Sequence, residues 1–177
     1  MANKKNIVRR IKSAVISVSD KSNLKPLLQT LNRYNVKLIS SGGTFKAIRK
    51  LGYRCLEVSD YTGFNEILDG RVKTLHPKIH AGILNKRNNN SHKREIEKNN
   101  FQNIDLVIVN FYPFEKTLNT TKNHNKIIEK IDIGGPALVR SAAKNYNDVA
   151  VITSINQYSA LIDQLKRFKG ATKLEFR

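Results

Sequence analysis

Five short apolar runs rich in β-branched residues recur along the chain, and they constrain its fold more than any other feature. They cover residues 14–18, 36–40, 53–58, 104–109 and 148–153. Near-continuous apolar strands of this kind are buried on both faces, as in a parallel sheet. Helical patterns lie between and after them, at residues 22–34, 44–52, 91–100, 124–131, 136–146 and 155–168. This alternation predicts an α/β fold, a three-layer doubly wound and mainly parallel five-stranded sheet with helices on both faces.

Length and composition limit the class of protein. A chain of 177 residues fits one domain, which we place at residues 13–170 after a basic extension at 1–12. The longest apolar runs, such as residues 106–111, are far shorter than the roughly 20 residues of a membrane span. The basic N-terminus has no apolar core of a secretory signal, and Cys55 is the single cysteine. We therefore expect no membrane contact, no disulfide and a reducing, cytoplasmic setting.

The charge is strongly positive, with 32 Lys and Arg against 14 Asp and Glu for a net charge of +18. Nucleic acid, an anionic small substrate and a merely solvated basic surface all fit such a charge. The basic residues are spread along the chain, and the aromatic residues do not interleave with them as a stacking platform would. We expect no nucleic-acid partner and favour an anionic small molecule.

Polar side chains follow several of the predicted strands, where ligands bind in sheets of this type. In SGGT, Gly42 and Gly43 permit a tight turn whose N–H groups approach a phosphate, and Ser41 and Thr44 add hydroxyls. A plain strand-to-helix turn with Thr44 as the N-cap accounts for these four residues equally well. SDK places Ser19 and Lys21 after the first strand, where Lys21 either meets the phosphate or is solvated beside a helix cap.

Residues 70–84, GRVKTLHPKIHAGIL, gather cationic and hydroxyl donors between glycines. The pattern is too irregular for an amphipathic helix, and Pro77 interrupts any helix that crosses it, so we expect a rigid loop. His76 and His80 are four residues apart, as in zinc helices, but Pro77 separates them and the glutamate of HExxH is missing. The sequence therefore predicts no metal site.

Two further segments carry chemistry. In NFYPF, Tyr112 either stacks on a base, donates to an oxyanion or packs at the sheet edge. In IDIGGPALVRSAAKN, Asp132 precedes a helix that Pro136 opens, and Lys144 lies near its other end. Twelve residues separate Asp132 from Lys144, so a straight helix alone does not bring them together. A small-residue helix packed on the sheet accounts for the segment equally well.

The segments SVSDK, SGGT, GFNEILDGRVKTLHPKIHAGIL, NFYPF and IDIGGPALVRSAAKN occur in an order that resembles a known family. Together they resemble the N-terminal domain of the bifunctional purine-biosynthesis enzyme, the IMP cyclohydrolase part of AICAR transformylase/IMP cyclohydrolase. The match covers nearly the whole chain after about residue 12. It implies a methylglyoxal-synthase-like fold. It also implies the last step of purine synthesis, closure of 5-formamidoimidazole-4-carboxamide ribonucleotide (FAICAR) to inosine 5′-monophosphate (IMP) with loss of water.

The family pattern assigns roles to individual residues of this sequence. Those expected to bind substrate are Ser19, Lys21, Ser41, Gly42, Gly43, Thr44, Arg71, Thr74, Asn110 and Ile133. Those expected in catalysis are Lys73, Tyr112, Asp132 and Lys144. We expect Asp132 and Lys144 to transfer protons, Lys73 to serve as a second acid/base or electrostatic group, and Tyr112 to face the oxyanion. Tyr146 departs from the family, which often has histidine after AAKN.

The resemblance also implies partners. The substrate is an anionic nucleotide, and ring closure needs no metal or cofactor. Full-length relatives carry a formyltransferase region that uses 10-formyl-tetrahydrofolate, and residues 171–177 resemble the start of the connection to it, so we expect this chain to close the ring without loading the formyl group. We expect a homodimer, weaker without that region. Two other functions stay open: a methylglyoxal-synthase-like lyase acting on a triose phosphate, and a nucleotide-sensing module.

Overall fold

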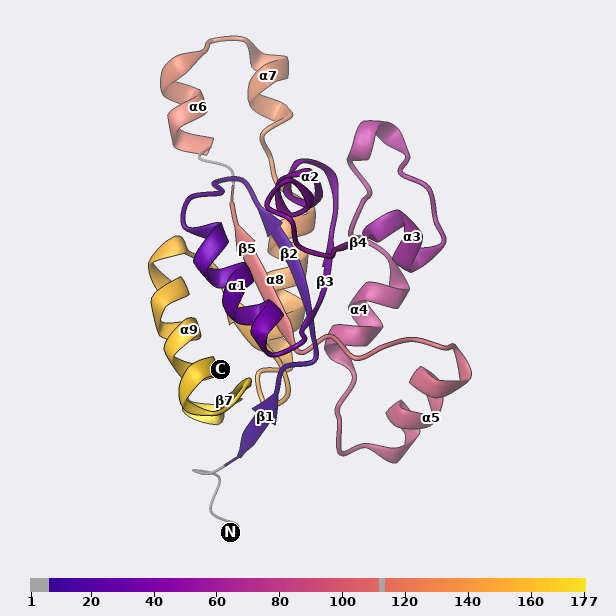
Figure 1. The fold of residues 1–177 in the computed structure, drawn as a ribbon. Helices are drawn as coiled ribbons and strands as arrows, with labels where there is room; N and C mark the ends of the chain where they lie inside the picture. The colour runs from indigo at the N-terminus through magenta and orange to yellow at the C-terminus, as the bar shows by residue number, and fades with distance from the viewer. Residues whose placement is uncertain (1–6, 112–113) are drawn as a thin grey trace.

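A parallel sheet organises the chain, which the computed structural model describes over residues 7–111 and 114–177 (Figure 1). Across these ranges the sheet has five strands in the order β4-β3-β2-β5-β6, and every neighbouring pair is parallel. The strands are β2 (Ser13–Val18), β3 (Lys37–Ser40), β4 (Leu56–Glu57), β5 (Leu106–Asn110) and β6 (Ala150–Ile152). The predicted five-stranded parallel sheet is confirmed.

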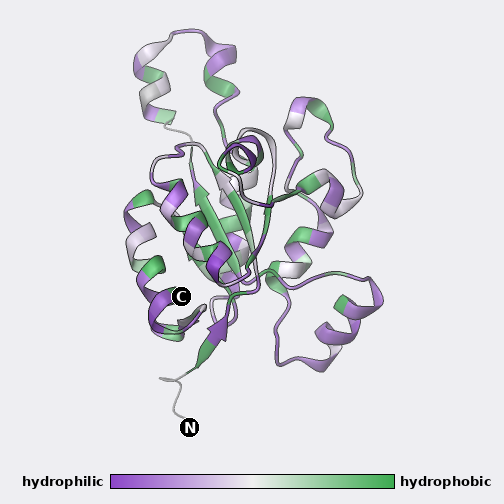
Figure 2. Ribbon diagram, viewed as in Figure 1, coloured by the Kyte–Doolittle hydropathy of each residue, from purple (hydrophilic) through white to green (hydrophobic). Residues whose placement is uncertain are grey.

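Side chains of the central strands alternate between two hydrophobic clusters, one on each face of the sheet. Ala14 and Ile16 of β2 belong to one cluster and Val15 to the other. The first cluster includes residues of α1 (Leu24–Arg33), α2 (Gly42–Lys50) and α9 (Tyr158–Arg167). The second includes residues of α3 (Val58–Thr62), α4 (Pro77–Leu84) and α8 (Gly134–Lys144). Figure 2 shows the apolar strands between these layers, so the expected three-layer, doubly wound architecture is confirmed.

Two local expectations were wrong. The run at 53–58 yields only a two-residue edge strand, because Val58 begins α3 and is buried with Tyr61 on the second face of the sheet. A helix also follows the loop at 71–76, because Pro77 occupies the first helical position of α4. Proline is tolerated there, since an N–H at that position has no intrahelical partner. The His76 side chain caps this helix by accepting a hydrogen bond from the Lys78 amide.

Helices also form in the polar stretches between the core elements. Residues Asn90–Lys98 form α5, which has no buried residue. Phe114–Thr120 form α6 and His124–Ile128 form α7. These last two helices project together beyond the end of the sheet at which β5 finishes (Figure 1). The chain returns from α7 directly to the N-terminus of α8.

The two ends of the described chain pair with each other. Strands β1 (Val8–Arg10) and β7 (Ala171–Lys173) form an antiparallel sheet of two strands. The Arg177 guanidinium strengthens this junction by donating hydrogen bonds to the carbonyls of Thr172, Ile7 and Asn147. Residues that we placed outside the domain on both sides are thus held together at the end of the sheet opposite α6 and α7 (Figure 1). Short 3₁₀ helices also occur within the described ranges, at η2 (Leu68–Gly70), η3 (Ile155–Gln157) and η4 (Leu174–Phe176).

None of the helices within the described ranges has the length and apolar character needed to cross a membrane.

Candidate active site

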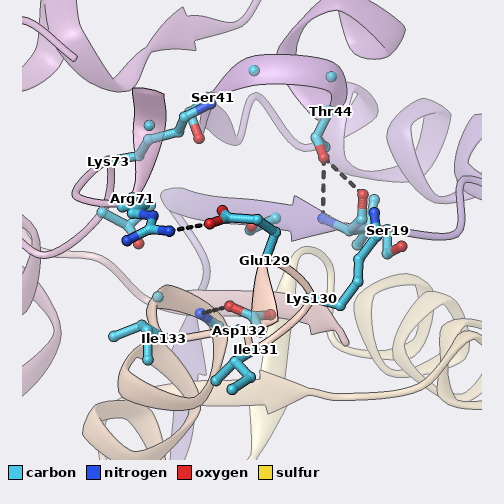
Figure 3. Close-up of a pocket in the computed structure, with 18 of the residues that line it drawn as sticks. Ser19, Ser41, Thr44, Arg71, Lys73, Glu129, Lys130, Ile131, Asp132 and Ile133 are labelled. Atoms are coloured by element: carbon cyan, nitrogen blue, oxygen red, sulfur yellow. Dashed lines mark hydrogen bonds and ion pairs between the residues drawn. The ribbon is translucent and has the colours of Figure 1, made fainter. Parts of the chain in front are cut away.

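A pocket of about 550 Å³ opens where β2, β3 and β5 end (Figure 3). Ligand pockets of parallel α/β sheets lie at this edge, and the volume is within the range of sites for small molecules. Twelve of the predicted site residues line it: Ser19, Lys21, Ser41, Gly42, Gly43, Thr44, Arg71, Lys73, Thr74, Asn110, Asp132 and Ile133. The structure therefore brings together segments that are more than 100 residues apart in sequence.

The first turn of α2 is shaped to receive an anion. Gly42 has φ +53°, which favours glycine, and a Cβ there would lie 3.2 Å from the Lys73 Nζ. A Cβ on Gly43 would lie 3.9 Å from the Lys21 Nζ. Two ammonium groups thus approach a helix N-terminus, whose exposed N–H groups already favour negative charge.

The hydroxyl of Thr44 serves the framework of this turn. It donates to the Val18 carbonyl at 2.9 Å and accepts from the Val18 amide at 3.1 Å, and the residue is only 5% exposed. The Thr44 proton is therefore already used, which corrects our expectation that this hydroxyl adds a donor toward the ligand. The alternative of Thr44 as N-cap is also wrong, because Ser41 holds the N-cap position, without a side-chain cap bond.

Asn110, at the end of β5, holds the loop that follows β2. Its Oδ1 accepts from the amides of Ser19 at 2.6 Å and Asp20 at 2.9 Å, and its Nδ2 donates to the Asp20 carbonyl. The Lys21 ammonium turns back to the carbonyls of Val18 and Ser19, at 3.3 and 3.1 Å. Asn110 thereby fixes the position from which Lys21 faces the α2 turn.

The loop at 71–74 supplies two cations and a hydroxyl. Arg71 forms an ion pair with Glu129, and Lys73 forms one with Glu66 at 3.0 Å. Thr74 is 6% exposed, and a Cβ on Gly134 would come within 2.6 Å of its hydroxyl oxygen. This loop therefore packs closely against the start of α8.

Asp132 lies at the N-terminus of α8. Its Oδ1 accepts from the Gly135 amide at 2.8 Å, and a Cβ on Gly135 would lie 2.4 Å from its Oδ2. A side chain at residue 135 would displace this carboxylate, so only glycine allows it to lie across the first turn of the helix. The predicted residues Asp132 and Ile133 both border the cavity, as Figure 3 shows.

Sequence analysis missed one wall of the pocket, the connection from α7 to α8 with Glu129, Lys130 and Ile131. These residues follow no strand, so their position at the sheet edge depends on the path of the projecting helices. The signal available was their adjacency to Asp132. With them, the lining contains four basic residues and three acidic ones: Lys21, Arg71, Lys73, Lys130, Asp69, Glu129 and Asp132.

Two predicted catalytic residues are not placed in this pocket. Lys144 is exposed at the last position of α8, an eleven-residue helix that begins at the pocket. At 1.5 Å per residue, the helix carries its last residue about 15 Å away from its first. Its role stays a prediction from the resemblance alone. Tyr112 lies outside the described residues.

The remaining histidine and cysteine candidates do not assemble a metal centre. His76 caps α4, and His80 Nδ1 lies 2.9 Å from the Ser141 hydroxyl. Across residues 7–111 and 114–177, no three His, Cys, Asp or Glu side chains gather closely enough to hold an ion. Burial raises the pKa of the Cys55 thiol to about 12, so this cysteine is a thiol rather than a nucleophilic thiolate.

A doubly wound parallel sheet with a pocket at the carboxyl ends of its strands, and cations over the first turn of a helix there, defines the class of the protein as an α/β domain. Comparison with protein families gives the particular family: residues 23–137 match the MGS-like domain, and this chain belongs to that family. A solved structure, the crystal structure of ForH, has the same fold, with a TM-score of 0.79 and 32% identity over 90% of this chain and 82% of that one.

Curated relatives resemble the chain over almost its whole length. The bifunctional purine biosynthesis protein PurH of Dinoroseobacter shibae is 48% identical over 94% of this chain. The proteins of the same name from Clostridioides difficile and Prochlorococcus marinus are 50% and 52% identical, over 88% and 91% of it. The resemblance to the bifunctional purine-biosynthesis family is confirmed. The chain spans about a third of the length of these relatives, 30–32%.

Proposed function

We propose that this chain catalyses the closure of FAICAR to IMP with release of water, a step of purine biosynthesis. The observation that carries the proposal is one cavity that combines a glycine-rich helix N-terminus with a lysine and a carboxylate, Lys73 and Asp132. The relatives, named for purine biosynthesis, support the same assignment. In this proposal, one cavity supplies groups for both ends of a nucleotide, the phosphate and the reacting base.

The phosphate of the nucleotide binds at the first turn of α2 in this proposal. Lys21 lies close to Gly43 at this turn, and the helix N-terminus adds its N–H groups. Thr44 contributes by holding the turn against β2, and Asn110 by holding the Lys21 loop. The base then extends toward Thr74 and the N-terminus of α8, where Asp132 lies.

Ring closure joins the carboxamide nitrogen to the formamide carbon of the same molecule. The carboxamide nitrogen loses one proton and the formamide nitrogen loses a second, the formyl oxygen gains both, and its bond to carbon breaks to release water. Because both groups belong to one substrate, orientation contributes much, and well-oriented cases reach effective molarities on the order of 10⁵–10⁸ M. The amide nitrogen is a poor nucleophile, so the site must also move protons.

Asp132 and Lys73 are the groups that we assign to proton transfer. The Asp132 carboxylate accepts the proton of the attacking nitrogen, and the Lys73 ammonium faces the formyl oxygen as it becomes a leaving group. The proposed role of Tyr112 at the oxyanion comes from the sequence alone. The division of roles requires no metal or cofactor, and we propose that the reaction proceeds without either.

The test is incubation of the purified chain with FAICAR in buffer containing EDTA, followed by ultraviolet absorbance. We expect FAICAR to disappear and IMP to form at equal rates, far above the enzyme-free background. Methylglyoxal produced from a triose phosphate would identify the chain as a lyase instead. Binding of IMP without turnover of FAICAR would identify it as a nucleotide-sensing module, and dependence on added zinc or magnesium would contradict the metal-free mechanism.

A further inference from the structure

Lys73 approaches the pocket with a long side chain that needs support to stay there. Its side chain is 30% exposed, and holding a flexible lysine side chain in one position costs rotamer entropy. The Glu66 Oε1 lies 3.0 Å from its Nζ. Glu66 does not line the cavity of 550 Å³ but a smaller hollow behind the 71–74 loop, which Lys73 also borders. The carboxylate therefore contacts the ammonium from outside the proposed substrate site.

A tightly wound turn brings Glu66 to this position. Leu68, Asp69 and Gly70 have successive positive φ angles of 52°, 51° and 85°. The left-handed region is sterically unfavourable for a residue with a side chain, and it is unusual for leucine. Strain of this kind persists only where the surrounding structure holds it, and it is concentrated at functional sites. Here the turn reverses the chain, so that residues seven apart in sequence form an ion pair.

Gly70 shows that the Glu66–Lys73 pair is packed onto the turn. A Cβ on Gly70 would lie 2.0 Å from the Lys73 Cε and 2.5 Å from the Glu66 Oε1. Both side chains thus cross the space that a side chain at residue 70 would fill. The pair is held by packing as well as by charge, which distinguishes it from an ordinary surface ion pair.

We infer that Glu66 is a positioning residue that holds the Lys73 ammonium over the first turn of α2 for the reaction. This inference rests on the proposed function. A lysine ammonium has three hydrogen-bond donors, and Glu66 engages it from the side away from the cavity, which leaves donors for the substrate. Without the carboxylate, the ammonium would sample many rotamers, and fewer encounters would find it in place.

The experiment compares Glu66→Gln, Lys73→Gln and the double variant in steady-state closure of FAICAR. We expect Glu66→Gln to lower kcat about tenfold while KM changes less than about threefold, a coupling within the range for residues in contact. In the Lys73→Gln background, the same change at Glu66 should alter the rate less than about twofold. Glu66→Asp should recover part of the loss. Glu57→Gln, in the same hollow, is the matched control and should behave like the unmodified chain.

The outcomes separate the two hypotheses. If the unmodified chain does not convert FAICAR, the proposed function is wrong and the role of Glu66 falls with it. If the chain is active and Glu66→Gln is fully active, the positioning role alone is wrong. An equal loss from Glu66→Gln with and without Lys73 also overturns it, because a general structural defect acts in both backgrounds. A melting temperature within about 2 °C for all variants supports intact folding, since Glu66 is 45% exposed.

Discussion

The hydroxyl of Thr44 exchanges two hydrogen bonds with the backbone of Val18, one given and one received. Val18 is the last residue of β2, and Thr44 lies in the first turn of α2. One side chain therefore joins the end of a central strand to the helix turn at which we propose the phosphate binds. The strand amide and carbonyl are both satisfied in a place that water does not reach.

The first prediction concerns this link. Thr44→Val should destabilise the chain by about 1–3 kcal/mol, because it removes the hydroxyl that accepts from the buried Val18 amide and one of the donors to the Val18 carbonyl. Thr44→Ser should recover most of that free energy of unfolding. Thr30→Val is a matched control, because Thr30 is also buried but its hydroxyl only donates to a carbonyl within its own helix. Urea unfolding curves measure all three, and equal losses at Thr44 and Thr30 would contradict the assignment.

The second prediction concerns Lys73. Lys73→Ala should lower the rate of FAICAR closure at least about 10²-fold, the lower end for loss of an acid/base group. Lys93, exposed on α5, is the control, and Lys93→Ala should leave the rate unchanged. Circular dichroism of both variants checks the fold. Near-normal turnover in Lys73→Ala would remove this residue from the mechanism.

A third prediction comes from the opposite end of the sheet. The Arg87 guanidinium, 11% exposed, lies 3.6 Å from Asp105 and donates to the carbonyls of Gly82 and Ile104. Asp105 in turn accepts from the amide of Ser13 at the start of β2. Removing one member of a buried pair leaves the other charge uncompensated, so Arg87→Met should destabilise the chain by about 3–5 kcal/mol.

Thermal and urea unfolding measure the effect of Arg87→Met. Arg94→Met, on the exposed face of α5, should shift the free energy of unfolding by less than about 0.5 kcal/mol. Similar losses in the two variants would show that the network around Asp105 contributes no special stability.

The parts of the structure that the sequence predicted correctly depend on local patterns and on general rules of parallel sheets. Apolar periodicity predicted the sheet and its flanking helices, because burial on two faces leaves few other choices for runs such as 104–109. Strand-exit reasoning placed the α2 turn and the 71–74 loop in one pocket, since parallel strands end at the same edge. Neither argument depends on long-range detail.

The misses depend on features that have no local signal. Glu129 reaches the pocket through the path of two projecting helices, and Glu66 through a left-handed turn at residues 68–70. Pro77 illustrates a different limit. Proline interrupts a helix that crosses it but is also favoured at the first position of a helix, so the residue alone does not show which case applies. The pairing of β1 with β7 joins residues more than 160 apart, which no short pattern shows.

The fourth prediction is a pH dependence at His80. Burial lowers the pKa of this imidazole below its usual value of 6.5, so the folded chain favours the neutral form. As the pH falls below about 6.5, the unfolded chain takes up the proton more readily than the folded one, and stability is lost. Above that pH the imidazole is neutral in both the folded and the unfolded chain, so its contribution to the free energy of unfolding no longer changes with pH. His80→Asn should therefore flatten the dependence of stability on pH between about 7.5 and 5.

Urea unfolding at several pH values measures this slope. His124→Asn, which replaces an exposed histidine at the start of α7, is the control. An unaltered slope in His80→Asn, or a steeper one, would contradict the role assigned to His80.

The last prediction concerns the ion pair between Arg71 and Glu129, which links the 71–74 loop to the end of α7 across the pocket (Figure 3). Both side chains are well exposed, at 64% and 55%, so the pair itself contributes at most about 1 kcal/mol to stability. Glu129 places a negative charge in the wall of a pocket that we propose for an anionic nucleotide. It also pairs with Arg71, whose positive charge would otherwise be available to the ligand.

Glu129→Gln should therefore tighten the binding of IMP, by about threefold for a change of roughly 0.7 kcal/mol at a partly exposed site. Arg71→Gln should weaken it. Isothermal titration calorimetry measures both, with Glu95→Gln on α5 as the control. The difference between Glu129→Gln and the unmodified chain should shrink as salt is raised from about 0.05 M to about 0.5 M, because screening acts on exposed charges. Weaker binding in Glu129→Gln would mean that this carboxylate contacts the nucleotide directly, as a hydrogen-bond acceptor rather than as a competing charge.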